Sequence, residues 1–224
     1  MLFLNKKKKR LAILYLCLGE DNDKWEEMHN TLEKYFMPKV EKHYFVFSDD
    51  IKRFKIAKHI YPFEIPNLPT PLNEVMKIHH FLSKEDLYAG FDYMMFLDSS
   101  CNITSKVDDK DVFPRSILSE RFSFLLDHSK DSLKPEDYPY ERNYDSTAFV
   151  NYNRGKYYID DSFVLGETNS FLEMCHTLDN NILEDLKHNY ISDRVIEVHL
   201  NKYIVNIVDG RILDKIKGLS IEEQ

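Results

Sequence analysis

The stretch FDYMMFLDSSCNIT, residues 91–104, decides how this chain folds. It is an apolar run of strand length that ends abruptly in polar residues, among them Asp98 and Ser100. A continuous apolar run predicts a strand buried on both faces of a sheet. Because open α/β sheets bind ligands beyond the carboxyl ends of such strands, we expect Asp98 and Ser100 at a ligand-binding edge. The alternative is an ordinary strand end closed by an Asp-Ser turn.

The segments on both sides alternate between strand-like and helix-like patterns. Apolar runs with polar ends occur at 10–19, 43–50, 121–128 and 162–167, and an edge strand containing Pro62 is expected within 55–65. Apolar residues at helical spacing predict helices at 25–36, 72–82, 171–182 and 195–204. This alternation predicts an α/β fold with a mostly parallel, doubly wound sheet, in a single domain over residues 1–224.

Two expectations about packing follow from these patterns. The buried face of the helix at 72–82 should be Leu72, Val75, Met76, His79 and Leu82. The carboxyl ends of the strands should also gather Asp49, Asp98, Asp127 and His128 at one edge of the sheet, together with the segment that leads into 162–167. The sequence has neither Gly-x-Gly-x-x-Gly nor GxxxxGK[ST], so the usual dinucleotide and nucleoside-triphosphate motifs are missing.

Composition and charge exclude several classes of partner. The 30 basic and 38 acidic residues give a net charge of −8, which argues against nucleic acid or an anionic membrane as a general partner. The opening MLFLNKKKKR places its charges after its apolar residues, unlike a secretory signal, and is too short to span a bilayer. We expect KKKKR to be a solvated tail, or else a weak electrostatic tether, so membrane contact would be peripheral at most.

The cysteines indicate a reducing compartment. Cys17, Cys101 and Cys175 are odd in number, lie in apolar runs and show no Cys-x-x-Cys spacing. Reduced thiols in the core of a cytoplasmic protein are therefore expected, and disulfides or a cysteine-bound zinc ion are not.

A longer stretch, YERNYDSTAFVNYNRGKYYIDDSFVLGETNSFLEMC (residues 140–175), is more specific. Its Tyr-Glu-Arg, Ser-x-Ala-Phe and Gly-Lys-Tyr-Tyr motifs, followed by a strand, a glycine and a helix, resemble the middle of glycosyltransferase family 6. This family contains the histo-blood-group A and B transferases and the α-1,3-galactosyltransferases, and the stretch is closer to the family's bacterial members. Residues 11–20, 77–103 and 197–205 resemble other parts of the family in the right order.

The resemblance implies a GT-A fold, with a Rossmann-like, mostly parallel twisted sheet flanked by helices and a nucleotide-sugar lying across the strand ends. It also implies retaining transfer of galactose or N-acetylgalactosamine from a UDP-sugar to a hydroxyl of an oligosaccharide or lipid-linked glycan. The donor-binding positions that it assigns are Leu16, Cys17, Leu18, Lys77, Asp98, Ser100, Asp160, Asp161 and Ser162.

Several of these donor positions depart from the family pattern. Asp98 and Ser100 stand at the two outer positions of the family's Asp-x-Asp, whose carboxylates hold Mn²⁺ or Mg²⁺ against a diphosphate. With one carboxylate lost, we expect that no metal is required, although Asp98 still offers one carboxylate ligand to Mn²⁺ or Mg²⁺. Asp160 and Asp161 replace a glycine-rich segment that lies against the donor sugar, so the sugar should differ or bind differently. Lys77 stands near a family arginine but lacks its bidentate fork.

The resemblance places the chemistry at Glu197, which stands at the glutamate proposed as nucleophile or stabiliser on the reacting face of the sugar. Without the resemblance, Glu197 would be read as a solvated glutamate at a helix start. His128 stands where the family has an acceptor-binding histidine. The family's Trp-His-Asp before the glutamate is replaced by Arg194, Val195 and Ile196.

The sequence is therefore compatible with two functions. The first is the transferase that the resemblance implies. The second is a catalytically degenerate member that binds a sugar, a nucleotide or a partner protein without transfer. The altered motifs favour the second, as does a C-terminal segment (208–224) shorter than the family's basic lid, although Arg211, Lys215 and Lys217 provide some positive charge. Glu197, His128 and Asp98 favour the first.

Overall fold

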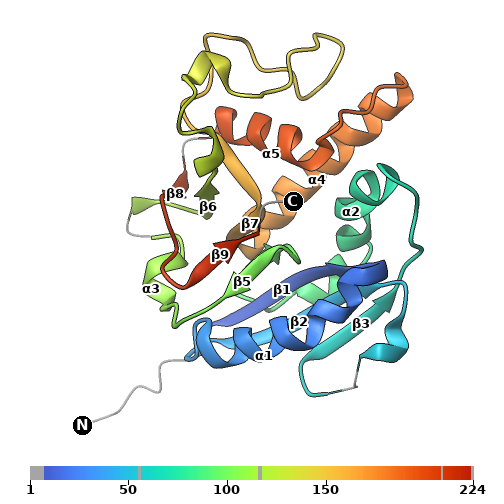
Figure 1. The fold of residues 1–224 in the computed structure, drawn as a ribbon, viewed down its shortest axis with the longest axis vertical. Coiled ribbons are helices and arrows are strands. Elements are labelled where there is room, and N and C mark those ends of the chain that lie inside the picture. Colours follow the sequence, from blue (N-terminus) through green and yellow to red (C-terminus); the bar gives the residue numbers. More distant parts are fainter. Residues whose placement is uncertain (1–7, 55–56, 116–117, 208, 223–224) are drawn as a thin grey trace.

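Figure 1 shows the computed structural model, which describes residues 8–54, 57–115, 118–207 and 209–222. Lys6 and Lys7 of the basic N-terminal run lie outside the described residues.

The centre of the fold is a seven-stranded sheet with the order β3-β2-β1-β4-β7-β6-β8. Every neighbouring pair is parallel except those of β7, which runs antiparallel to both β4 and β6. The predicted mostly parallel sheet is therefore confirmed, and β3, which contains Pro62, is an edge strand as expected. The strands are β1 (Arg10–Cys17), β2 (Glu41–Ser48), β3 (Ile60–Glu64), β4 (Tyr93–Leu97), β6 (Phe122–Leu126), β7 (Ile159–Glu167) and β8 (Gly210–Leu213).

A second, two-stranded sheet pairs β5 (Cys101–Ile103) with β9 (Leu219–Ile221) in antiparallel fashion. β5 lies at the end of the stretch 91–104, and β9 comes from the C-terminal segment. This pairing brings the end of the described chain back beside the polar end of β4 (Figure 1).

Helices cover both faces of the large sheet. α1 packs on one face, whereas α2, α4 and α5 pack on the other. The α-helices are α1 (Trp25–Tyr35), α2 (Leu72–Leu82), α3 (Asp109–Val112), α4 (Thr168–Lys187) and α5 (Val195–Asn206). Short 3-10 helices occur at Gly19–Lys24, Ile51–Arg53, Glu85–Tyr88, His128–Lys130 and Pro135–Asp137.

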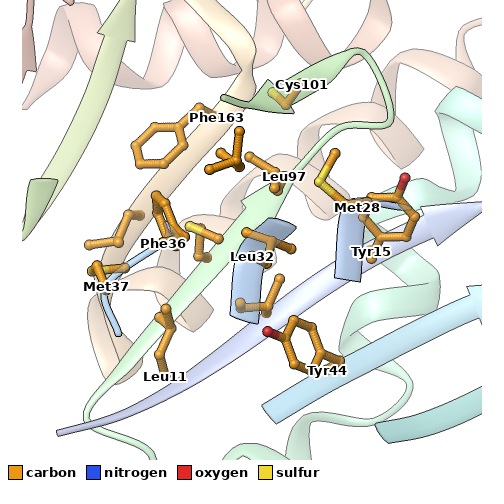
Figure 2. Packing of buried hydrophobic residues seen from close by; sticks show 14 of the residues in the cluster. Leu11, Tyr15, Met28, Leu32, Phe36, Met37, Tyr44, Leu97, Cys101 and Phe163 are labelled. Atoms are coloured by element: carbon orange, nitrogen blue, oxygen red, sulfur yellow. The ribbon is translucent and has the colours of Figure 1, made fainter. Parts of the chain in front are cut away.

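The burial of β1 on both faces explains its continuous apolar sequence. Leu11 and Tyr15 point into a cluster with Met28 and Leu32 of α1 (Figure 2). The intervening residues of the strand enter the opposite cluster, with residues of α2 and α4. Because alternate side chains of a strand point to opposite faces, a strand between two helical layers needs an apolar residue at every position.

The buried face of α2 differs from the prediction. Val75 is buried as expected, but the other buried residues are Lys77, Ile78 and Phe81, while His79 is half exposed. The prediction was right for Val75, and Met76 and Leu82 pack partly buried against the core, but it was wrong for the exposed Leu72 and His79 and it treated Lys77 as a surface residue. In the structure its ammonium group faces Glu74 of the same helix and Asp98 and Asp161 from other elements, so Lys77 lies on the buried side of α2.

Cys17, Cys101 and Cys175 are buried free thiols, as predicted. Within the described part of the chain, no helix is both long and apolar enough to cross a membrane.

Candidate active site

A cleft of about 1150 Å³ lies at the edge of the sheet where β4 and β6 end and the antiparallel β7 begins. This reversal of β7 brings Asp160 beside Asp98 and Asp127, although the three are far apart in sequence. The cleft matches the general position of ligand sites in open α/β sheets. Its polar lining residues include Glu74, Lys77, Asp98, Ser100, Asp127, His128, Lys130, Asp160, Asp161, Ser162, Asp193, Arg194, Glu197, Asp214, Lys215, Lys217 and Glu222.

Lys77 is the buried cation of the cleft. Its side chain is only 3% exposed, and its Nζ lies 3.7 Å from Asp98 Oδ2 and 3.6 Å from Glu74 Oε2. Burial opposes the charged ammonium, but Glu74, Asp98 and Asp161 outweigh it and raise the pKa of Lys77. Burial likewise opposes ionisation of Asp98, but Lys77 and the Ser100 backbone N–H, which donates at 3.0 Å, lower the pKa of Asp98. Both groups are therefore charged at neutral pH.

The donor atoms at this strand end do not fit the divalent metal of the Asp-x-Asp motif. Asp98 faces the Lys77 ammonium, and Ser100 is 4% exposed and has a neutral hydroxyl where the motif has a second carboxylate. Mn²⁺ and Mg²⁺ require several hard oxygen ligands, preferably anionic ones. In the described part of the chain, the group of close ligands that could hold a metal is Glu41, His43 and His59, which is not part of the cleft wall.

Asp160 and Asp161, at the start of β7, line the cleft together with Asp98 and Glu197. Asp160 Oδ1 accepts a hydrogen bond from the Ser162 backbone N–H at 2.8 Å, which closes a short turn at the start of β7. Burial raises the pKa of Asp161 to about 7, despite the opposing effect of Lys77, and the negative charges of Glu197 and Glu74 add to the increase. Asp161 is therefore a mixture of neutral and ionised forms at neutral pH.

Glu197, in the first turn of α5, is held by two donors. Tyr158 Oη donates to Glu197 Oε1 at 2.5 Å, and Arg194 Nη1 donates to the same oxygen at 2.8 Å. The glutamate side chain is 18% exposed and lines the cleft. Hydrogen bonds of this kind fix the direction of the carboxylate.

Asn201, one turn further along α5, joins the backbone at Glu197 to the backbone at the start of β7. Its side-chain amide donates to the backbone carbonyls of Ile159 and Glu197, both at 3.0 Å, and its Oδ1 accepts from the Ile159 N–H at 2.9 Å. Asn201 is completely buried. The start of β7 and the first turn of α5 are therefore joined as one unit, which brings Asp160 and Asp161 to Glu197.

His128 lies in the cleft wall at the end of β6. Its Nδ1 lies 2.8 Å from Asp131 Oδ2, and its Nε2 lies 2.6 Å from the Asp214 carbonyl oxygen. The hydrogen bond with Asp131, followed by that with the Asp214 carbonyl, raises the pKa of His128. The imidazole thus ties the end of β6 to the C-terminal segment.

The predicted nucleoside contacts Leu16, Cys17 and Leu18 are at the end of β1 and outside the cleft wall. Asp49 is likewise outside it. Asp49 accepts hydrogen bonds from the Gly19 N–H at 3.1 Å and from Asn22 at 2.8 Å, so it holds the turn that follows β1. The structure therefore brings Asp98, Asp127 and His128 together, as expected, and leaves Asp49 outside this group.

The sequence of this chain matches a known protein family. The model described as glycosyltransferase family 6 matches residues 22–215. The chain belongs to glycosyltransferase family 6. Its mostly parallel sheet flanked by helices is the GT-A-like arrangement that the resemblance implied.

Two relatives agree with this family membership. The chain is 26% identical over 196 residues to the O-antigen biosynthesis glycosyltransferase WbnI of Escherichia coli, covering 86% of this chain and 81% of the relative. It is 32% identical over 80 residues to the N-acetyllactosaminide alpha-1,3-galactosyltransferase-like 1 protein of Mus musculus, covering 36% of this chain and 24% of that protein. Glycosyl transfer is thus the activity of the family to which this chain belongs.

The family-6 motifs at 140–158 hold the loop between β6 and β7 against the helices (Figure 1). Ser146 Oγ donates to the buried Asp185 of α4 at 2.6 Å. Gly155 has a φ of +94°, and a Cβ there would lie 2.4 Å from the Tyr140 hydroxyl oxygen and 2.5 Å from a carbon of its ring, so only glycine fits. These contacts hold the loop that carries Tyr158, which donates its hydrogen bond to Glu197.

Sequence reasoning missed three contributors to this family-6 cleft. Glu74 precedes Lys77 by one helical turn, a spacing that signals an ion pair on one helix face. In the sequence, Tyr158 stands only as the last residue of the Gly-Lys-Tyr-Tyr motif. Arg194 stands only as a residue that differs from the family's Trp-His-Asp. Lys215 and Lys217 of the C-terminal segment line the cleft, whereas Arg211 binds the carbonyls of Lys110 and Phe113 outside it.

Proposed function

We propose that this family-6 chain is a cytoplasmic, retaining hexosyltransferase, with one domain spanning residues 1–224. In this proposal it moves a galactose-like or N-acetylgalactosamine-like sugar from a UDP-sugar to a hydroxyl of an oligosaccharide or lipid-linked glycan. The observation that carries the proposal is the convergence of Lys77, Asp98 and Glu197 on one cleft at the strand ends of a family-6 fold. The printed names of the relatives, one in O-antigen biosynthesis and one α-1,3-galactosyltransferase-like, support a glycan acceptor and a galactose-like donor.

The donor diphosphate would lie beside Lys77 and Asp98. The Lys77 ammonium supplies a fixed positive charge in a poorly hydrated site, where it attracts a phosphate oxygen more strongly than it would in water. Lys215 and Lys217 also line the cleft and add positive charge to it. The base would extend toward Leu16–Leu18, and Ser100 and Ser162 would border the sugar-phosphate.

Glu197 would perform the chemistry. Departure of UDP leaves positive charge on the anomeric carbon, and a carboxylate on the reacting face either attacks that carbon or stabilises the charge. Tyr158 and Arg194 hold one Glu197 oxygen in a fixed direction, so the carboxylate needs little reorganisation during the reaction. Asp160 and Asp161 would border the sugar, and His128 would contact the acceptor.

The rival is a binding module that has lost catalysis. One observation favours it: Arg194 forms an ion pair with Glu197, in a position where the family has a residue of its Trp-His-Asp motif. This cation competes with the developing positive charge of the sugar for the same carboxylate. If it dominates, the protein would bind a UDP-sugar without transferring it.

A two-stage experiment separates the two functions. Thermal unfolding with a panel of UDP-sugars identifies the donor, because a ligand at a hundredfold its Kd stabilises the folded state by about 2.7 kcal/mol. UDP release is then followed with the stabilising donor, with and without an oligosaccharide acceptor mixture. Stabilisation with turnover supports the transferase, and stabilisation without turnover supports the binding module. The absence of stabilisation by every UDP-sugar at millimolar concentration would contradict both.

A further inference from the structure

A second group of chemically active side chains lies at the opposite end of the sheet from the cleft. Glu41 and His43 occupy alternate positions at the start of β2, so both point to the same face, and His59 immediately precedes β3. One ligand atom from each residue lies within 4.8 Å of those of the other two. Because β2 and β3 are parallel and the cleft lies at the carboxyl edge of the sheet, this group is at the amino edge.

The spacing of these atoms is close to that of a metal site. His43 Nε2 lies 2.9 Å from Glu41 Oε1, and the rings of His43 and His59 have their centroids 3.9 Å apart. Zinc binds nitrogen and oxygen ligands at about 2.0–2.2 Å, so neighbouring ligands of a tetrahedral ion lie roughly 3.4 Å apart. Small side-chain rotations are therefore sufficient to accommodate an ion.

His43 is oriented as metal-binding histidines are. It is 4% exposed, and its second ring nitrogen, Nδ1, lies 3.1 Å from Tyr61 Oη, whose ring stacks parallel to the imidazole. A hydrogen-bond partner on the second nitrogen fixes the tautomer and direction of a ligating histidine. This leaves Nε2 directed toward Glu41.

His59 is held beside His43 by an uncommon backbone conformation. Its φ is +71°, a region that few residues other than glycine adopt. The carbonyl of His59 accepts a hydrogen bond from the Tyr44 N–H at 2.8 Å, which anchors this residue to β2. A backbone that is both unusual and anchored is frequent at functional positions.

Arg10 is the competing cation at this group. Its Nε lies 3.4 Å from Glu41 Oε1, but its guanidinium also donates to the Gly90 carbonyl and lies over the Phe91 ring. Arg10 therefore keeps its place if Glu41 turns toward an ion. Two imidazoles and one carboxylate suit zinc and similar transition metals rather than Mg²⁺ or Ca²⁺, which prefer oxygen ligands.

We propose that Glu41, His43 and His59 bind a zinc-class divalent cation, with water as a fourth ligand, at the edge of the sheet opposite the cleft. The ion would join β2 to the segment that enters β3 and stabilise that edge of the sheet. This site is independent of the proposed transfer reaction, because none of its residues lines the cleft.

The test is calorimetric titration of the EDTA-treated, dialysed full chain with ZnCl₂, with Co²⁺ absorption as a spectroscopic readout. We expect one equivalent of Zn²⁺ to bind and to raise Tm. Glu41→Gln and His59→Asn should each weaken the Kd by at least about tenfold. Asparagine tolerates a positive φ, and His59→Gly provides a second replacement that suits this backbone if the first variant fails to fold. Asp98→Asn is the matched control at the cleft and should leave zinc affinity unchanged.

Three outcomes would overturn the proposal. One is a wild-type Kd weaker than about 100 µM, which corresponds to less than roughly 5.5 kcal/mol of binding free energy. The second is unchanged affinity in folded variants of Glu41 and His59. The third is a loss of binding in Asp98→Asn, which would place the ion in the cleft.

Discussion

Lys77 Nζ lies 3.7 Å from Asp98 Oδ2, so an ammonium group occupies the space beside the carboxylate at the end of β4. The same cation lies 4.1 Å from the centre of the Phe96 ring, and the side chain is almost completely buried. Removing one partner of a buried ion pair is costly, because it leaves the other charge buried and unpaired. This pair therefore affects both the proposed reaction and the stability of the fold.

Transfer or donor hydrolysis should depend little on divalent metal, because Lys77 already supplies the positive charge beside Asp98. Turnover in EDTA should be within about tenfold of turnover in Mn²⁺, a difference of at most roughly 1.4 kcal/mol in the barrier. The measurement is UDP release at saturating donor. A larger loss in EDTA would mean that Asp98 takes part in a metal site during turnover.

Lys77→Met should strongly destabilise the protein, because Asp98 and Glu74 would lose their shared cation. Removal of one partner from a buried pair typically costs about 3–5 kcal/mol. The double variant Lys77→Met/Asp98→Asn should recover part of this loss, since it leaves no lone charge at Asp98. Urea unfolding measures the effect, and exposed Lys187→Met is the control, with a change of at most about 0.5 kcal/mol. A single variant as stable as the control would contradict the importance of the pair.

Glu197→Gln should retain the fold and UDP binding but reduce turnover by about a hundredfold or more, equal to roughly 2.7 kcal/mol of transition-state stabilisation. The amide keeps the shape of the side chain and can accept the hydrogen bond from Tyr158, but it loses the negative charge. The matched control is Glu173→Gln on the exposed face of α4, which should behave as wild type. Near-normal turnover of Glu197→Gln would exclude Glu197 as the catalytic anion.

Asp161→Asn should stabilise the protein at neutral and alkaline pH but not near pH 4. The carboxyl titrates near 3.8 in the unfolded chain, whereas burial raises the pKa of the folded Asp161 to about 7. The folded state thus binds the proton more tightly, and wild-type stability falls as pH rises between these two values. The neutral amide avoids this loss. Melting curves of the wild type and of Asp161→Asn between pH 4 and pH 8 should therefore diverge as pH increases. A pH-independent effect of Asp161→Asn would contradict the raised pKa.

The double variant Asp160→Gly/Asp161→Gly should shift donor preference toward UDP-galactose and UDP-N-acetylgalactosamine. In the proposed donor site the two carboxylates would fill space beside Glu197 and place negative charge near the diphosphate, and glycine would remove both effects. Relative kcat/KM values over a donor panel measure the shift. An unchanged ranking of donors in a folded double variant would show that these residues do not contact the sugar.

Much of the fold could be predicted from the sequence because the signals are local. The apolar run of β1 and the alternation of strands with helices follow from burial on two faces of one sheet, which imposes a pattern on neighbouring residues. The strand-end position of Asp98 follows from the same pattern. Four stretches in family order were sufficient to indicate the family, which the match over residues 22–215 confirmed.

The sequence by itself thus determined the layered α/β architecture, the family and the edge of the sheet where the polar residues gather. Only the tertiary structure decided which of them meet. Lys77 turns inward because carboxylates from β4 and β7 face it, and Tyr158 reaches Glu197 across 39 residues of chain. Electrostatic attraction and hydrogen bonding act between groups that are close in space, and sequence spacing does not encode that closeness for residues on different elements. The group formed by Glu41, His43 and His59 arises in the same way, because the parallel pairing of β2 with β3 brings the residue before one strand beside the start of the other.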